Sequence, residues 1–257
     1  MVVDLSESMA DDGEQEHRSA HDGGIGTGYI NAARGSETDT VTEHPNLRYR
    51  YCLKTVVNVL LERNTTHDQP PVPPLPAVKD SVGEMVSFPT ILDGDDRLSL
   101  ETFATTARHE VNLTVMHSQV LAALAQQSSE RFEKNSNAGG GIHEGIQELQ
   151  STRARAGTPK VILLLTHGRA SVGSSGSLSY SAGGSYAIQM ATQAANAGMT
   201  IYAVGIGADA DMGLLNEIVR IGHGSAFHAE GSIDQYREQL HEAFRALGEN
   251  RPSVLIQ

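Results

Sequence analysis

The chain has 257 residues, a net charge of −12, and 39% hydrophobic and 19% charged residues, values typical of a globular protein long enough to bury a sizeable core. An acidic chain is repelled by phosphate groups, which argues against nucleic acid or an anionic membrane as a partner. The single cysteine, Cys52, excludes an internal disulfide, and no stretch approaches the roughly 20 apolar residues of a membrane span.

The first nine residues combine a short apolar run with an Asp-x-Ser-x-Ser turn. Residues 1–3 predict a stubby first strand. Asp4, Ser6 and Ser8 then place one carboxylate and two hydroxyls on a single tight turn. Three hard oxygen donors suit Mg²⁺ or another small divalent cation, although Asp and Ser also crowd ordinary turns by bonding their own backbone. The short first strand and the strand-like residues 251–257 lead us to expect a fragment of a longer protein.

Two insertions are expected before the regular part of the chain. Residues 10–45 are polar, glycine-rich and without apolar periodicity, which predicts a long surface insertion. A helix is then predicted from the spacing i, i+3, i+4, i+7, i+8 of Leu53, Val56, Val57, Leu60 and Leu61. Residues 65–93 form the second expected insertion. Its proline-rich part, residues 69–76, predicts a polyproline II spacer or a docking segment for a proline-reading domain.

The rest of the chain alternates between strand and helix patterns. Strands are predicted over residues 96–104, 110–115, 160–166, 200–207 and 225–229, and helices over 119–127, 142–153, 185–197, 211–221 and from 232 onwards. A Ser/Gly-rich loop is expected over residues 171–184. This alternation, with late strands that are continuous apolar runs, predicts a single α/β domain over residues 1–250 with a mainly parallel, doubly wound sheet. Ligands of such sheets bind at the carboxyl ends of strands, and the turn that begins at Asp4 follows such an end.

Five segments, in order, resemble a von Willebrand factor A (VWA) domain. They are Asp4-x-Ser-x-Ser-Met9, Asp96-Arg-Leu-Ser99 with Phe103-Ala104, residues 139–145, Leu163-Leu-Leu-Thr-His-Gly-Arg169, and Ile201-Tyr-Ala-Val-Gly-Ile-Gly207. The resemblance implies a Rossmann-like fold with a metal-ion-dependent adhesion site (MIDAS). It also implies that Ser6 and Ser8 coordinate Mg²⁺ or Mn²⁺ directly and Asp4 through water, and that a partner's carboxylate completes the shell. Residues 96–99 and 113–116 resemble most the intracellular eukaryotic branch linked to RING or U-box modules, which implies an intracellular, cytoplasmic location.

Two further ligands that the resemblance implies are missing. Gly140 stands where the family has a threonine, and a shift of one residue gives Gly141, which offers no hydroxyl either. His167 stands where the family has an aspartate at a strand end. The site thus loses one oxygen ligand and one carboxylate, which lowers the expected affinity for magnesium.

The altered site has three interpretations. In the first interpretation the site no longer binds a cation, and the fold binds partners without metal. In the second the site binds a cation weakly, and Glu7 restores the missing negative charge. In the third interpretation the metal is different, because imidazole suits zinc, and His167 with His143 joins Asp4. The first two interpretations are favoured over the third, because a lone histidine near a turn is most often simply hydrogen-bonded.

Other polar residues carry no expected site. The spacing of His17 and His21 fits metal binding only on a helix, and their surroundings predict a solvated loop. His223 and His228 have no recognisable partner pattern, and Glu101 is interpreted as an edge or solvent-facing residue without function.

The predicted function is protein–protein binding, without catalysis. The predicted surface is the edge formed by the first turn, residues 139–141, His167 and a flexible loop over residues 171–184, which suits adaptation to a partner. The alternative is a metal-independent scaffold in a ubiquitin-ligase-type protein, which recruits partners through the proline-rich segment. A hydrolase is a remote alternative, because no Gly-x-Ser-x-Gly elbow or phosphate-binding loop is present.

Overall fold

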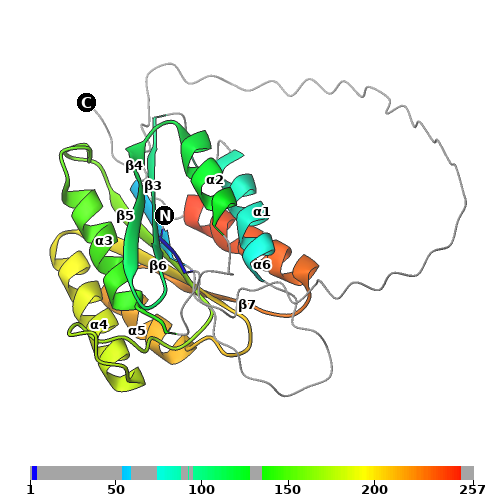
Figure 1. Ribbon diagram of the computed structural model, residues 1–257. Coiled ribbons are helices and arrows are strands. Elements are labelled where there is room, and N and C mark those ends of the chain that lie inside the picture. The colour runs from blue at the N-terminus through cyan, green and yellow to red at the C-terminus, as the bar shows by residue number, and fades with distance from the viewer. Residues whose placement is uncertain are drawn as a thin grey trace, which may run out of the picture.

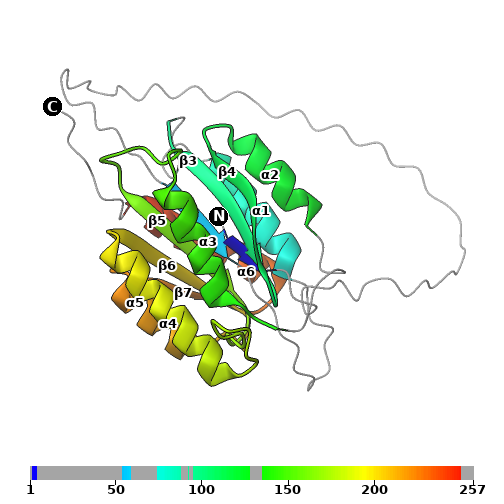
Figure 2. The same ribbon diagram turned by 60° about the vertical axis from the view of Figure 1, so that its left-hand side comes forward.

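The computed structural model describes residues 2–4, 54–58, 74–87, 92, 95–127 and 135–249. In these ranges a central sheet has helices on both faces, which confirms the expected α/β class (Figure 1). Helices α1 (Pro74–Ser87), α2 (His117–Gln126) and α6 (Ile233–Glu249) cover one face. Helices α3 (Ala138–Gln150), α4 (Tyr180–Asn196) and α5 (Met212–Ile221) cover the other face (Figure 2). The protein is thus a three-layered α/β sandwich.

The sheet is parallel except for one edge strand. Its order is β1-β3-β2-β5-β6-β7, and β4 pairs with β3 in the antiparallel sense. The bounds are β1 Val2–Asp4, β2 Lys54–Asn58, β3 Arg97–Phe103, β4 Ala107–Thr114, β5 Lys160–Thr166, β6 Met199–Ile206 and β7 Ala226–Ala229. Strands β5 and β6 coincide with the two apolar runs of the sequence, because a strand covered by helices on both faces buries every side chain.

Two short strands share one position between β3 and β5. Strand β2 pairs with the first part of β5, from Val161 to Leu164, whereas β1 pairs with Leu164 and Leu165 near its end. Both strands also pair with β3, β2 at its start and β1 at its end. The three residues of β1 therefore occupy only the carboxyl part of this central position, and β2 occupies the amino part.

The helix expected over residues 53–61 is wrong, because residues 54–58 form β2. Three β-branched residues, Thr55, Val56 and Val57, follow one another here, and such residues favour a pleated strand over a helix. A short stretch that mixes apolar and polar residues can satisfy helical spacing and still form a strand, so the period alone does not decide between the two. Leu53, Leu60 and Leu61 lie outside the described residues.

Helix α1 lies inside the stretch interpreted as a proline-rich insertion. The polyproline II conformation is wrong for residues 74–76, which form the first turn of α1, and residues 69–73 lie outside the described ranges. Proline is tolerated in a first helical turn because its missing N–H would have no partner there. Val78, Val82 and Met85 of this helix are buried against the sheet with α2 and α6. No helix in the described part of the chain combines the length and apolarity needed to cross a bilayer.

Several predicted helix ends are confirmed. Gly198 follows α4 with a positive φ of 72°, a conformation that favours glycine. Asp211 caps α5 by accepting the Leu214 N–H at 3.0 Å. The start of α6, predicted at residue 232, carries a capping box, in which the Ser232 N–H donates to Gln235 Oε1 at 2.7 Å and the Gln235 N–H to Ser232 Oγ at 3.4 Å.

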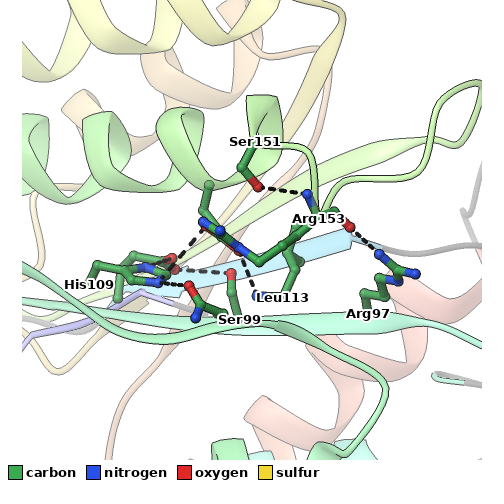
Figure 3. Close-up of polar contacts among 9 residues, drawn as sticks. Arg97, Ser99, His109, Leu113, Ser151 and Arg153 are labelled. Carbon is green, nitrogen blue, oxygen red and sulfur yellow. Dashed lines mark hydrogen bonds and ion pairs between the residues drawn. The ribbon is translucent and has the colours of Figure 1, made fainter.

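Glu101 is buried, not at an edge or facing solvent as expected from the sequence. It is 0% exposed in β3, and its Oε1 lies 3.0 Å from Nδ1 of His109 on β4 (Figure 3). The hydroxyl of Ser99 donates a hydrogen bond of 3.3 Å to the other carboxylate oxygen of Glu101, Oε2. The hydrogen bond from His109 to Glu101 is the main reason why the pKa of His109 is raised to about 9. A buried carboxylate is thus paired with a cation supplied by the neighbouring strand.

A second buried carboxylate, Glu148 of α3, lies beside the same histidine. Glu148 is 3% exposed and accepts hydrogen bonds from the Leu113 N–H at 2.6 Å and from Nε of Arg153 at 2.9 Å. Its Oε2 lies 3.9 Å from His109 Nε2, which also contacts Asn112 (Figure 3). Burial alone raises the pKa of Glu148, but the hydrogen bonds from Arg153 and Leu113 lower it overall. This polar cluster ties the β3–β4 hairpin to α3.

The cluster predicts that His109 makes stability depend on pH. The folded pKa of about 9 lies above the unfolded value of 6.5, so the contribution of His109 is complete below pH 6.5 and is lost as pH rises through about 9. We expect the difference in unfolding free energy between the wild type and His109→Gln to be largest below pH 6.5 and to shrink towards pH 9. Urea unfolding across this range measures it, and a difference that is constant with pH would contradict the assignment.

Candidate functional site

The carboxyl ends of the parallel strands and the amino ends of helices α3, α4, α5 and α6 meet at one edge of the sheet. Asp4 ends β1 with its backbone paired to Phe103 of β3, and β5 ends beside them at Thr166. Helices α3, α4 and α5 begin at this edge (Figure 2). The side chain of Asp4 and the whole of Ser6, Glu7 and Ser8 lie outside what the structure describes, so their metal-binding role stays a prediction.

The glycines of residues 139–141 form the first turn of α3, which the sequence analysis placed one turn later. Asn137 caps this turn, with its Oδ1 accepting the Gly140 N–H at 2.8 Å. A Cβ atom at Gly140 would lie 2.7 Å from the Asn137 side chain, so a threonine here requires the cap to move. A Cβ atom at Gly139 would lie 2.4 Å from the ring of Tyr186 on α4. A side chain at Gly140 would collide with the Asn137 cap, and one at Gly139 would collide with Tyr186 of α4. The absence of a threonine hydroxyl at this turn is therefore linked to the cap and to the close packing of α3 on α4.

His167 follows β5 directly and packs towards β6 and α6. A Cβ atom at Gly207, which follows β6 with a φ of 84°, would lie 2.5 Å from Cδ2 and Nε2 of the imidazole. The same Cβ would lie 3.4 Å from the hydroxyl of Tyr236 on α6. Burial lowers the pKa of His167 to about 4, so the ring is neutral near pH 7. His167 thus fills the space that the absent side chain of Gly207 leaves.

The described residues do not assemble a histidine-based metal site. No three His, Cys, Asp or Glu side chains among them are grouped so that they could hold a metal ion. His143 lies on α3 and His167 faces Gly207. The zinc interpretation joins His167 and His143 to Asp4, whose side chain lies outside what the structure describes, so it stays a prediction.

The loop after β5 is a hydrogen-bonded hairpin, unlike the flexible loop expected from its Ser/Gly composition. Val172 and Leu178 form an antiparallel bridge, and the Gly173 N–H donates to the Ser177 carbonyl at 2.8 Å. The Ser179 N–H donates to the Ser171 carbonyl at 2.8 Å, and its hydroxyl caps α4, which begins at Tyr180 and not after residue 184. The loop, residues 171–179, therefore holds a defined shape.

The same loop is anchored to the segment before α3. The Ser136 N–H donates to Oγ of Ser171 at 2.8 Å, and the Ser136 carbonyl accepts the N–H groups of Ser171 and Val172. Helix α4 adds a second anchor, because it packs closely on the start of the loop at Gly183. A Cβ atom at this glycine would lie only 2.4 Å from the backbone of Ala170. The first turn of α3 and the loop thus form one continuous surface.

This surface carries exposed side chains that the sequence analysis did not single out. Leu178 is 61% exposed and Tyr180 is 48% exposed. The guanidinium of Arg169 stacks on Tyr180, with Cζ 4.4 Å from the ring centroid, and its Nε lies 3.6 Å from Oδ2 of Asp211. These residues form no sequence motif, because they lie far apart in the chain: after β5, at the start of α4 and at the start of α5.

A family model of the von Willebrand factor type A domain matches residues 72–242 of the chain. The chain belongs to this family. The matched residues run from just before α1 into α6. They do not include Asp4, Ser6 and Ser8. A search of curated proteins finds no relative with a significant sequence match.

Solved structures share the VWA fold at low sequence identity. The conserved hypothetical protein BatB from Bacteroides thetaiotaomicron is 14% identical with a TM-score of 0.58, and the match covers 77% of this chain and 100% of that one. The vWF domain of the type V pili tip protein Mfa5 from Porphyromonas gingivalis is 11% identical with a TM-score of 0.57, covering 80% and 98%. Proximal thread matrix protein 1 from the mussel byssus, solved with a zinc-occupied MIDAS motif, is 15% identical with a TM-score of 0.57, covering 77% and 46%.

Two adjacent glycines of α4 test how the loop of this VWA domain is anchored. Gly183→Ala is expected to lower the unfolding free energy by about 1–3 kcal/mol, because its methyl group meets the Ala170 backbone. Gly184→Ala is the matched control: its nearest neighbour is Leu214 at 3.8 Å, so the helix is expected to gain up to about 1 kcal/mol. Thermal and urea unfolding measure both variants, and equal effects of the two would contradict the anchoring contact.

Proposed function

We propose that this VWA domain is a protein-interaction module that binds a polypeptide partner at the carboxyl edge of its sheet and does not catalyse a reaction. The observation that carries the proposal is the hydrogen-bonded loop over residues 171–179, which holds Leu178 and Tyr180 exposed beside the first turn of α3. A rigid loop loses little conformational entropy on binding, and aromatic anchors contribute strongly to interfaces. The vWF domain of a pili tip protein and a pilus adhesin from Lactobacillus rhamnosus GG share the fold, which is in keeping with a binding role.

We also propose that the cation site at this edge is weakened or absent. Gly140 offers no hydroxyl, and the Asn137 cap takes the space of a side chain there. His167 is neutral and packs beside Gly207, so it supplies no negative charge in place of a carboxylate. Mg²⁺ or Mn²⁺ would then depend on Asp4, Ser6 and Ser8, with Glu7 as the nearest further carboxylate in the sequence.

The scaffold alternative receives less support. It needs the proline-rich segment as an extended docking strand, but residues 74–76 belong to α1, and Leu75 of this turn is buried in the core. Only residues 69–73 then remain for a proline-reading partner. The edge at Leu178 is therefore the better candidate for partner binding.

Metal titration tests the proposed state of the cation site. By calorimetry we expect Mg²⁺ and Mn²⁺ to bind with Kd on the order of millimolar or weaker, and Asp4→Ala to remove any signal. Adding Gly140→Thr and His167→Asp is expected to tighten binding only when Asn137→Ala is included, because alanine removes the side-chain atoms that lie 2.7 Å from the added Cβ, at a cost of about 1 kcal/mol for the lost cap. Micromolar magnesium binding by the wild type would contradict a weakened site.

Selection of short random peptides displayed on phage tests the binding function. We expect selected peptides to lose about tenfold or more in affinity for Leu178→Ser, because burial of an exposed leucine side chain by the peptide contributes about 1.5–3 kcal/mol. Val115→Ser is the matched control, since Val115 is 45% exposed and follows β4 at the opposite edge of the sheet. The proposal fails if no peptides are selected, or if both variants bind the peptides as the wild type does.

A further inference from the structure

Arg169 is a cation held in place at the carboxyl edge. It lies three residues after the end of β5, its side chain is 55% exposed, and its Cζ lies over the ring of Tyr180, 4.4 Å from the centroid. Stacking on an aromatic ring fixes the orientation of a guanidinium while leaving its edges open to hydrogen bonding. Arg169 is thus oriented before any partner arrives.

The hydrogen-bonding capacity of Arg169 is not used within the described part of the chain. Its contact with Asp211 is an ion pair of 3.6 Å between Nε and Oδ2, which is longer than a normal hydrogen bond. The other oxygen of Asp211 is engaged in capping α5 through the Leu214 N–H. No hydrogen bond from Nη1 or Nη2 to a described residue is present, so the two nitrogens that form a bidentate pair with a carboxylate remain open to a ligand.

Two helix ends and one carboxylate set the electrostatic surroundings of Arg169. Tyr180 is the first residue of α4 and Asp211 is the cap of α5, so the amino ends of both helices flank the guanidinium. The amino end of a helix carries partial positive charge. Physiological salt screens the distant charges of this acidic chain beyond a Debye length of about 8 Å. The carboxylate of Asp211 lies within that range, 3.6 Å from Nε, and offsets the positive charge on the Nε side, so a ligand carboxylate is expected at the Nη1 and Nη2 edge.

We propose that Arg169 binds a carboxylate of an acidic polypeptide partner directly, without a metal ion. The partner segment places an Asp or Glu side chain on the Nη1 and Nη2 edge of Arg169 and an apolar side chain against Leu178, two residues before Tyr180. This inference rests on the proposed function and specifies its partner chemistry. In this inference, Arg169 supplies the positive charge that attracts the partner's carboxylate. In the expected metal site, the bound cation would supply that charge.

Peptides selected by phage display in the presence of EDTA test this assignment. We expect the selected sequences to be enriched in Asp or Glu next to an apolar residue. A synthetic peptide of this kind should bind about tenfold or more weakly to Arg169→Gln, because a charged hydrogen bond is lost. Arg169→Lys should retain part of the affinity, because it keeps the charge but not the bidentate geometry.

The controls separate this inference from the proposed function. Arg220→Gln removes an exposed arginine that pairs with Glu217 at the far end of α5, and it should leave peptide affinity unchanged. Replacing the acidic residue of the peptide by its amide should weaken binding to the wild type but not to Arg169→Gln. If Leu178→Ser abolishes binding while Arg169→Gln does not, or if binding requires Mg²⁺, the function stands and this inference is wrong. If neither variant affects binding, both are wrong.

Discussion

The parallel pairing of β5 is the interaction on which the rest of this structure depends. This strand hydrogen-bonds to β1, β2 and β6, and its apolar side chains enter both cores, with Leu163 on one face and Leu164 on the other. Parallel strands linked by helices bring every strand end and the next helix start to the same edge. The position of His167, Arg169 and the following loop is therefore a direct consequence of the burial of β5.

At this edge, the two residues that the resemblance places at expected ligand positions, Gly140 and His167, are matched by packing. Asn137 occupies the space beside Gly140, and His167 occupies the space beside Gly207. Each pair is complementary, because a larger residue at the glycine would collide with its neighbour. Replacing only one residue of a pair therefore disturbs the packing. The chemistry of the expected cation site depends on these pairs as well as on the Asp-x-Ser-x-Ser turn.

The sequence predicts those features of the fold that depend on local chemistry. Strands β5 and β6 follow from continuous apolar runs, and the ends of α5 and α6 follow from their capping residues. Features that depend on distant partners are missed. The burial of Glu101 needs His109 from the next strand, and the hydrogen-bonded shape of the loop after β5 needs Ser136 from before α3. Strand β2 is mistaken for a helix, because its position between β3 and β5 is visible only in the assembled sheet.

The charge at the edge connects these observations to function. A binding surface that attracts a carboxylate needs positive potential, which a divalent cation, a helix terminus or an arginine can each provide. In the proposed weakened site, Gly140 and the neutral His167 supply neither of the two expected oxygen ligands, whereas Arg169 places a guanidinium over Tyr180 in the same connection after β5. Because an arginine is charged at every physiological pH and needs no metal supply, such a surface would recognise acidic partners whether or not the turn at Asp4 holds an ion.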